Sequence, residues 1–239
     1  MDKDTIKRLI IEYQQFVANI TLIEREIHLS HQLNYVFVGL RRAGKSYLMY
    51  QQIQSLLNDG HQPEEILYFN FEDDRLVNLT VEDLDLIKVS YEELYPHKPI
   101  FFLDEIQIVE HWEKFARRLA DQQYRVYITG SNAKMLSAEI ATTLGGRYIV
   151  QNVYPFSFSE FLKASKIEIG PTWYYKNRTE IVRTFSDYFS YGGLPELMLI
   201  ETIEKRQWLS NLFNKIFFGD LITRYSCLLY TSDAADELD

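Results

Sequence analysis

The sequence predicts an α/β fold, in which a five-stranded parallel sheet with flanking helices is followed by an all-helical region. Two observations support this prediction. Short apolar runs alternate with segments of helical periodicity between residues 34 and 153. The run at residues 99–103, PIFFL, is apolar without interruption, as in a strand that is buried on both faces of a parallel sheet. Beyond residue 153 only helical patterns follow.

The predicted strands combine β-branched and aromatic residues and end at glycine or at polar residues. They are residues 34–38, 66–71, 99–103, 125–129 and 148–153. Helical spacing of apolar residues predicts helices at residues 6–16, 46–57, 80–94, 112–119 and around 140–144, the last ending at Gly145 and Gly146. Thr80 with Asp83 matches a capping box at the start of the third of these helices.

The later part of the chain predicts a second region. Residues 156–162 and 179–189 have helical patterns, residues 192–195 (GGLP) form a turn, and residues 201–225 form a long helix. We therefore expect an N-terminal helix at 1–19, an α/β domain at 20–165, and the start of a truncated helical domain at 166–226.

The last residues, 227–239, have a different character. They begin CLLYTSDAADE, which resembles the translation of a transposon-derived sequencing adapter, so we expect a non-native tail after Ser226; a natural acidic tail is the alternative. The only cysteine lies there, which excludes a disulfide framework or a cysteine-based zinc site. The net charge of −9 argues against broad nucleic-acid coating. No apolar run approaches membrane-spanning length, and the N-terminus has no signal-peptide pattern, so we expect a soluble cytoplasmic protein.

The segment GLRRAGKS at residues 39–46 fits the pattern G-x-x-x-x-G-K-[ST] between a predicted strand and a predicted helix. Backbone N–H groups of such a loop, together with the helix N-terminus, form a cradle for phosphate. Lys45 supplies a charge for the outer phosphates, and the Ser46 hydroxyl can ligate Mg²⁺. The predicted nucleotide-binding residues are Gly39, Leu40, Arg41, Arg42, Ala43, Gly44, Lys45, Ser46 and Tyr47.

A second motif, FFLDE, ends the third predicted strand. Asp104 is predicted to hold Mg²⁺, directly or through water, as a Walker-B aspartate. Glu105 beside it is predicted to deprotonate the attacking water. The guanine-reading pattern N-K-x-D is missing, since Asn214-Lys215 is not followed by the aspartate, so we expect ATP as the nucleotide.

Further polar residues follow the fourth strand and precede the fifth. Ser131 and Asn132 are candidate sensors of the γ-phosphate, with capping of the next helix as the alternative. Arg147 is a candidate for stabilising transition-state charge, in its own chain or from a neighbouring subunit, with a surface ion pair as the alternative.

Several of these segments together resemble the prokaryotic AAA+-like ATPases, often called ATP-binding proteins, that carry a C-terminal domain of unknown function. The matching segments are IEREI, GLRRAGKS, FLDEIQ with Trp112, ITGSNAKMLS, LGGRY, VYPFSFSEFL and YGGLPEL. The resemblance implies a five-stranded ATPase core of the AAA+/ASCE-like P-loop NTPase type and a functional role for Arg147. It also implies that the helical region normally continues into more helices and a winged-helix-like module, through which a nucleic acid or a protein could bind.

Two functions are compatible with these patterns. The first is Mg²⁺-dependent ATP binding and hydrolysis that drives a conformational switch, in a possible homo-oligomer. The second is a nucleotide-gated nucleic-acid or protein binding module with little turnover, suggested by Arg41 and Arg42. A small-molecule kinase is a weaker third option, because no arginine-rich lid segment follows the third strand.

Overall fold

The computed structural model of the protein describes residues 2–76, 79–131, 142–167, 170, 172, 175 and 177–216. Several predicted features lie outside the described residues. They are Asn132, residues 140 and 141 of the helix expected around 140–144, the continuation of the final helix past residue 216, and the tail at 227–239; residues 142–144 are helical, as predicted.

The sheet has five parallel strands, as predicted. They are β1 (Asn34–Gly39), β2 (Ile66–Asn70), β3 (Ile100–Asp104), β4 (Val126–Ser131) and β5 (Tyr148–Asn152). Their order across the sheet is β2-β3-β4-β1-β5, and every adjacent pair is parallel. This order places β4 between the strand that leads into the glycine-rich loop and the strand that ends in Asp104.

The helices of this part lie before β1 and in the connections between strands, as the alternating pattern predicts. They are α1 (Lys3–Asn19), α2 (Lys45–Asn58), α3 (Val81–Leu94) and α4 (Trp112–Asp121), with 3-10 helices η1 (Pro63–Glu65) and η2 (Ile106–Ile108). The predicted capping box of α3 is present: Asp83 accepts a hydrogen bond from the backbone N–H of Thr80, at 2.9 Å. The chain therefore follows its local signals closely in this region.

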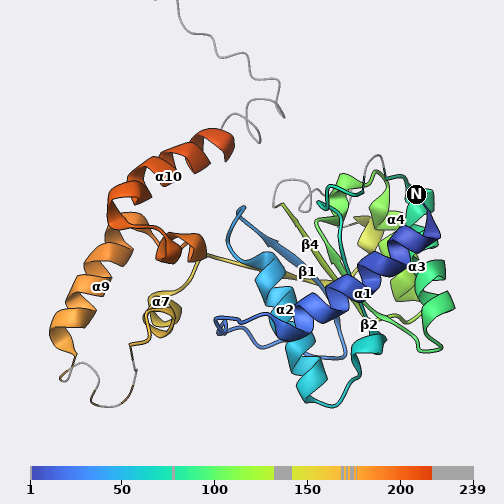
Figure 1. The fold of residues 1–239 in the computed structure, drawn as a ribbon, viewed down its shortest axis with the longest axis horizontal. Helices are drawn as coiled ribbons and strands as arrows, with labels where there is room; N and C mark the ends of the chain where they lie inside the picture. Colours follow the sequence, from blue (N-terminus) through green and yellow to red (C-terminus); the bar gives the residue numbers. More distant parts are fainter. Residues whose placement is uncertain are drawn as a thin grey trace, which may run out of the picture.

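Side chains alternate between two apolar cores, one on each face of the sheet. On one face, Val36 and Phe101 pack with α3, α4 and the first turns of α1. On the other face, Phe37 and Phe102 pack with α2 and with Val17 near the end of α1. Figure 1 shows α1 lying across the side of the sheet, where it reaches both cores.

A helical region follows β5 and forms an arm beside the α/β domain (Figure 1). It contains α7 (Phe158–Ala164), α9 (Arg178–Tyr191), the 3-10 helix η3 (Pro195–Leu199) and α10 (Thr202–Ile216). The turn predicted at 192–195 begins at Gly192, with φ +81°, and leads into η3. Over the described ranges, no helix combines the length and the apolar character needed to cross a membrane.

Candidate active site

The glycine-rich loop joins β1 directly to the N-terminus of α2. Gly39 is required by packing, because a Cβ atom there would lie 2.1 Å from the carbonyl oxygen of Val153. Gly44 is required by conformation, because it caps α2 with φ +94°, which a side chain would resist. The loop thus has the backbone geometry that the motif predicts, with the N-terminus of α2 aimed into it.

Lys45 lies at the centre of the site, and its side chain is 5% exposed. Its Nζ donates to the carbonyl oxygens of Gly39 at 3.3 Å and Leu40 at 3.2 Å. The same nitrogen lies 3.5 Å from Oε1 of Glu105. The two motifs therefore meet in space, with the loop cation beside the predicted base.

Asp104 is a buried carboxylate that accepts hydrogen bonds from hydroxyl groups. The Tyr68 hydroxyl donates to its Oδ2 at 2.6 Å, and the Thr129 hydroxyl donates to its Oδ1. Burial raises the pKa of Asp104 above its ordinary value, although hydrogen bonds from Thr129, Tyr68 and Ser46 oppose this shift. Burial also raises the pKa of the Tyr68 phenol, which therefore stays protonated and able to donate.

Glu105 turns the chain sharply after β3. Its φ of +56° is in the left-handed region, which costs a residue with a side chain on the order of 1 kcal/mol. The strained backbone is held by a 2.8 Å hydrogen bond from its N–H to the Thr129 hydroxyl oxygen. The Gln107 amide donates to Oε2 of Glu105, so the two carboxylate oxygens face Gln107 and Lys45 respectively.

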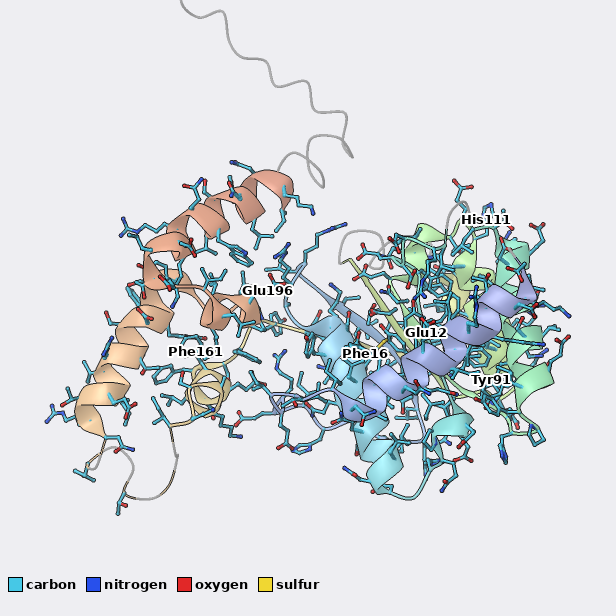
Figure 2. All side chains as sticks on the ribbon, in the orientation of Figure 1. Glu12, Phe16, Tyr91, His111, Phe161 and Glu196 are labelled. Carbon is cyan, nitrogen blue, oxygen red and sulfur yellow. The ribbon has the colours of Figure 1, made fainter. Side chains whose placement is uncertain are left out.

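A cavity of about 440 Å³ covers these groups and is closed on one side by the helical region. The α/β domain contributes Arg41, Arg42, Gly44, Lys45, Ser46, Tyr47, Tyr50, Asn70, Glu72, Asp104 and Glu105 to its lining. The helical region contributes Pro195, Glu196, Leu212 and Lys215. Figure 2 places Glu196 on the side of the helical arm that faces the α/β domain.

The two loop arginines contact acidic residues in different parts of the molecule. Arg41 lies 4.0 Å from Glu72 in the α/β domain. Arg42 pairs with Glu196 of η3, and its guanidinium lies 5.2 Å from the ring centre of Trp208 in α10. Arg42 therefore connects the glycine-rich loop with the helical region.

A buried ion pair makes a second connection between the loop and the helical region. Arg25 Nε donates to Oε1 of Glu160 in α7 at 2.8 Å, and both side chains are 5% exposed. The same guanidinium donates to the carbonyl oxygens of Ala43 in the loop, at 3.1 Å, and Tyr154, at 2.7 Å. Glu160 also accepts from the backbone N–H groups of Glu26 and Ser157. Each guanidinium nitrogen of Arg25 and each carboxylate oxygen of Glu160 has a hydrogen-bond partner, as buried charges require.

The predicted sensor residues are only partly within the described residues. Ser131 ends β4 and pairs with Gly39 across the sheet, so its backbone lies at the same edge as the loop. The role predicted for Asn132 falls on a position that the structure does not describe.

Arg147 does not join the site of its own chain. It precedes β5 at the amino-terminal edge of the sheet, where Asn34 pairs with Tyr148. The loop begins five residues further along β1, at Gly39, about 16 Å away at roughly 3.3 Å per residue. Arg147 Nε instead contacts Asp121 Oδ1 at 2.5 Å, which is the surface ion pair given above as the alternative.

Sequence reasoning missed the residues that hold the predicted ones. Thr129 and Tyr68 lie inside apolar strands, where a hydroxyl gives no signal of its partner. Arg25 and Glu160 lie in the segments IEREI and SFSEFL, which carried the family resemblance but no chemical role. Their spacing of 135 residues gives no indication that they meet.

Within the described residues, no three side chains of the His, Cys, Asp or Glu types cluster as a ready-made metal site. The oxygen donors that the site offers are the Ser46 hydroxyl and the Asp104 carboxylate, which interact with each other. This donor set suits Mg²⁺, which is bound through one or two protein oxygens, substrate phosphates and water.

Comparison with known proteins gives both a family match and individual relatives. Residues 31–162 match the family described as AAA domain. An uncharacterised protein of Methanocaldococcus jannaschii is 33% identical over 94% of this chain and 50% of its own length. One from Haemophilus influenzae is 34% identical over 85% of this chain and 51% of its own length.

The chain thus spans about half the length of these curated relatives. Among solved structures, the crystal structure of Cdc6p from Pyrobaculum aerophilum matches 68% of this chain and 48% of its own chain. Its sequence identity is 15% and its TM-score 0.40.

Proposed function

The chain belongs to the AAA domain family of P-loop ATPases, and on that premise we propose that it hydrolyses Mg²⁺-bound ATP as a conformational switch. The observation that carries this proposal is the meeting of Lys45, Ser46, Asp104 and Glu105 on one cavity that the helical region also lines. The convergence of two motifs about 60 residues apart on one cavity supports a ligand that both contact.

The loop residues bind and orient the phosphates in this proposal. Backbone N–H groups at the N-terminus of α2 supply partial positive charge, and Lys45 supplies a full one. Ser46 and Asp104 would hold Mg²⁺, which supplies charge neutralisation between the outer phosphates. Glu105, whose Oε1 lies 3.5 Å from Nζ of Lys45, accepts the proton of the attacking water.

The base of ATP has a place next to the loop. A second cavity, of about 300 Å³, adjoins Gly44 and Tyr47 and is lined mainly by apolar side chains, including Ile23, Phe156 and Pro195. Apolar cavities of this size accept flat heterocycles, because they remove the faces of the ring from water. Since Pro195 belongs to η3, the base as well as the phosphates would contact the helical region.

The switch would act through Arg42. Its guanidinium pairs with Glu196 and covers Trp208, and it projects from the loop that binds the phosphates. A bound triphosphate would compete with Glu196 for this cation, because both are anions beside the same half-exposed side chain. ATP binding and hydrolysis would therefore change the contacts that Arg42 makes with η3 and α10.

The proposed mechanism also includes Arg147 and the candidate γ-phosphate sensors Ser131 and Asn132. Because Arg147 lies at the far edge of its own sheet, we propose that it serves a neighbouring subunit of a homo-oligomer. A turnover rate per chain that stays constant on dilution to the monomer would contradict this role. We likewise propose that Ser131 and Asn132 respond to the γ-phosphate, since β4 ends beside Gly39.

The contacts of the loop arginines weigh against the alternative of a binding module with little turnover. Arg41 faces Glu72, and Arg42 faces Glu196 and Trp208, so both cations have acidic neighbours within the chain. Salt-sensitive DNA binding that collapses in a double Arg41→Ala, Arg42→Ala variant would restore that alternative.

Substitution of the predicted base tests the proposed hydrolysis. Glu105→Gln keeps the shape of the side chain but removes its basicity, so we expect turnover to fall by about 10²- to 10⁴-fold while ATP stays bound. The measurement is phosphate release at saturating ATP, paired with equilibrium ATP binding. Turnover by Glu105→Gln at the wild-type rate would show that Glu105 is not the base.

A further inference from the structure

Two buried hydroxyl groups hold the predicted metal ligand from both sides. Tyr68 donates to Oδ2 of Asp104 at 2.6 Å, and Thr129 donates to Oδ1. Tyr68 is 1% exposed and Thr129 is fully buried, so neither hydroxyl has water as an alternative partner. The two hydroxyls fix the plane of the carboxylate and so the direction in which its remaining lone pairs point.

Thr129 has a second contact that Tyr68 does not share. Its hydroxyl oxygen accepts the backbone N–H of Glu105 at 2.8 Å. This hydrogen bond supports the left-handed backbone of Glu105, which directs the side chain toward Lys45. One hydroxyl group therefore bridges the carboxylate that would hold the metal and the residue that would activate water.

A further hydroxyl contact links Tyr68 with the cavity. It lies 3.1 Å from the hydroxyl of Tyr50, and Tyr50 lines the cavity over the loop. The three elements β2, β3 and β4 thus contribute Tyr68, Asp104 and Thr129 to one hydrogen-bonded row across the sheet.

We propose that Thr129 and Tyr68 are positioning residues, which hold Asp104 for the metal and, through Thr129, Glu105 for water. This inference rests on the proposed function, because it assigns roles toward Mg²⁺ and the attacking water. Mg²⁺ demands near-ideal octahedral geometry, so a carboxylate that is free to rotate binds it less well than a fixed one. Partners that orient metal ligands commonly change metal affinity by about 10- to 100-fold.

The two positioning residues differ in what their loss should do. Tyr68→Phe removes one hydroxyl from Asp104 and leaves the Glu105 backbone held. It should weaken the effect of Mg²⁺ on nucleotide affinity but preserve the turnover number at saturating Mg²⁺. Thr129→Val removes the contacts to both carboxylate residues, so it should lower Mg²⁺-dependent affinity and the turnover number together.

The experiment measures binding of a fluorescent, non-hydrolysable ATP analogue to the full chain, with Mg²⁺ and with EDTA. In the wild type we expect affinity to rise when Mg²⁺ is present. We expect this rise to shrink by about 10-fold or more in Thr129→Val and Tyr68→Phe. Thr129→Ser, which keeps the hydroxyl, should retain the wild-type ratio.

A matched control separates positioning from loss of a buried hydroxyl in general. Tyr127→Phe, on the same strand as Thr129, removes a buried hydroxyl that contacts Gln52 instead of Asp104. We expect it to keep the wild-type ratio. If Tyr68→Phe and Thr129→Val behave like Tyr127→Phe, the positioning roles are overturned while the proposed function stands.

Failure of the wild type to bind the analogue would instead overturn the proposed function and the positioning roles together. If Thr129→Val does not fold, Tyr68→Phe still tests whether a hydroxyl that holds Asp104 affects the Mg²⁺ response, and Thr129→Ala tests whether position 129 requires a hydroxyl.

Discussion

The α/β domain and the helical region differ in how they are held together. The α/β domain has two large apolar cores, one on each face of the sheet. Among the described residues of the helical region, a small core cluster contains Leu162, Ile167 and Ile181. Large apolar side chains such as Phe189, Leu199 and Ile203 stay more than 75% exposed there. The helical region therefore has a smaller apolar core than the α/β domain, and ion pairs connect it with the glycine-rich loop.

This difference suits a switch, because a few polar contacts can be exchanged where a packed core cannot. These contacts are the ion pairs Arg25–Glu160 and Arg42–Glu196. Arg42 belongs to the glycine-rich loop, and Arg25 donates to the carbonyl oxygen of Ala43 in that loop.

The largest loss of stability is expected from substitutions in the apolar cores, and one substitution from each region allows a comparison. Phe102 is fully buried in β3 and stacks on Tyr127 with ring centres 4.5 Å apart, so Phe102→Ala should lower the free energy of unfolding by about 3–5 kcal/mol. Ile181→Ala, at the small core of α9, should cost about 2 kcal/mol and act on the helical region. Urea denaturation with hydrogen exchange of peptides from both regions measures the two losses. Equal exchange gains in β3 and α9 for Ile181→Ala would show a single cooperative unit.

The next largest loss of stability is expected at the junction between the glycine-rich loop and the helical region. Arg25→Met leaves the Glu160 carboxylate buried without its cation, which should cost about 3 kcal/mol and release the helical region. Lys163→Met is the matched control, because Lys163 pairs with Glu26 on the surface, and we expect no measurable change from it. Hydrogen exchange in α7 and η3 reports both variants. Equal hydrogen exchange in Arg25→Met and Lys163→Met would show that the buried pair does not hold the helical region in place.

The same pair gives the junction a pH dependence. Burial alone would raise the pKa of Glu160, but hydrogen bonds from Arg25 and from the Ser157 and Glu26 backbone outweigh it and lower the pKa. A lowered carboxyl pKa contributes stability above the ordinary value of 4.5, and that stability is lost as the pH falls below it. In the wild type, the protection of α7 amides from hydrogen exchange should decline as the pH falls below 4.5. In Glu160→Gln, the part of this decline that comes from protonation of Glu160 should be absent.

The smallest effect on stability is expected at Arg42. Its pair with Glu196 is about 40% exposed on both sides, so Arg42→Ala should cost about 1 kcal/mol, including the contact with Trp208. Arg41→Ala is the control, since Arg41 faces Glu72 within the α/β domain. The fluorescence of Trp208 should change on ATP addition in the wild type and in Arg41→Ala, but not in Arg42→Ala. An unchanged ATP response in Arg42→Ala would exclude Arg42 as the connection.

The sequence could predict the sheet and the centre of the site because both follow local rules. Strand patterns, the spacing of GLRRAGKS and the carboxylates after PIFFL are each readable within a few residues. Strand order is not local, and it brings Ser131 beside Gly39. Arg147 lies at the opposite end of the strands because it precedes β5 in a parallel sheet. The partners Tyr68 and Thr129 could not be found either, because a hydroxyl in a buried strand has the same local pattern whether or not it holds a carboxylate.

The central claim is that the loop around Lys45 binds the phosphates of ATP. Calorimetric titration of ATP with Mg²⁺ into the wild type and into Lys45→Ala tests it most directly, with thermal unfolding to verify that both proteins are folded. We predict saturable binding at a single site in the wild type and no detectable binding in Lys45→Ala. Equal affinity of the two proteins would contradict the assignment of this loop as the nucleotide site.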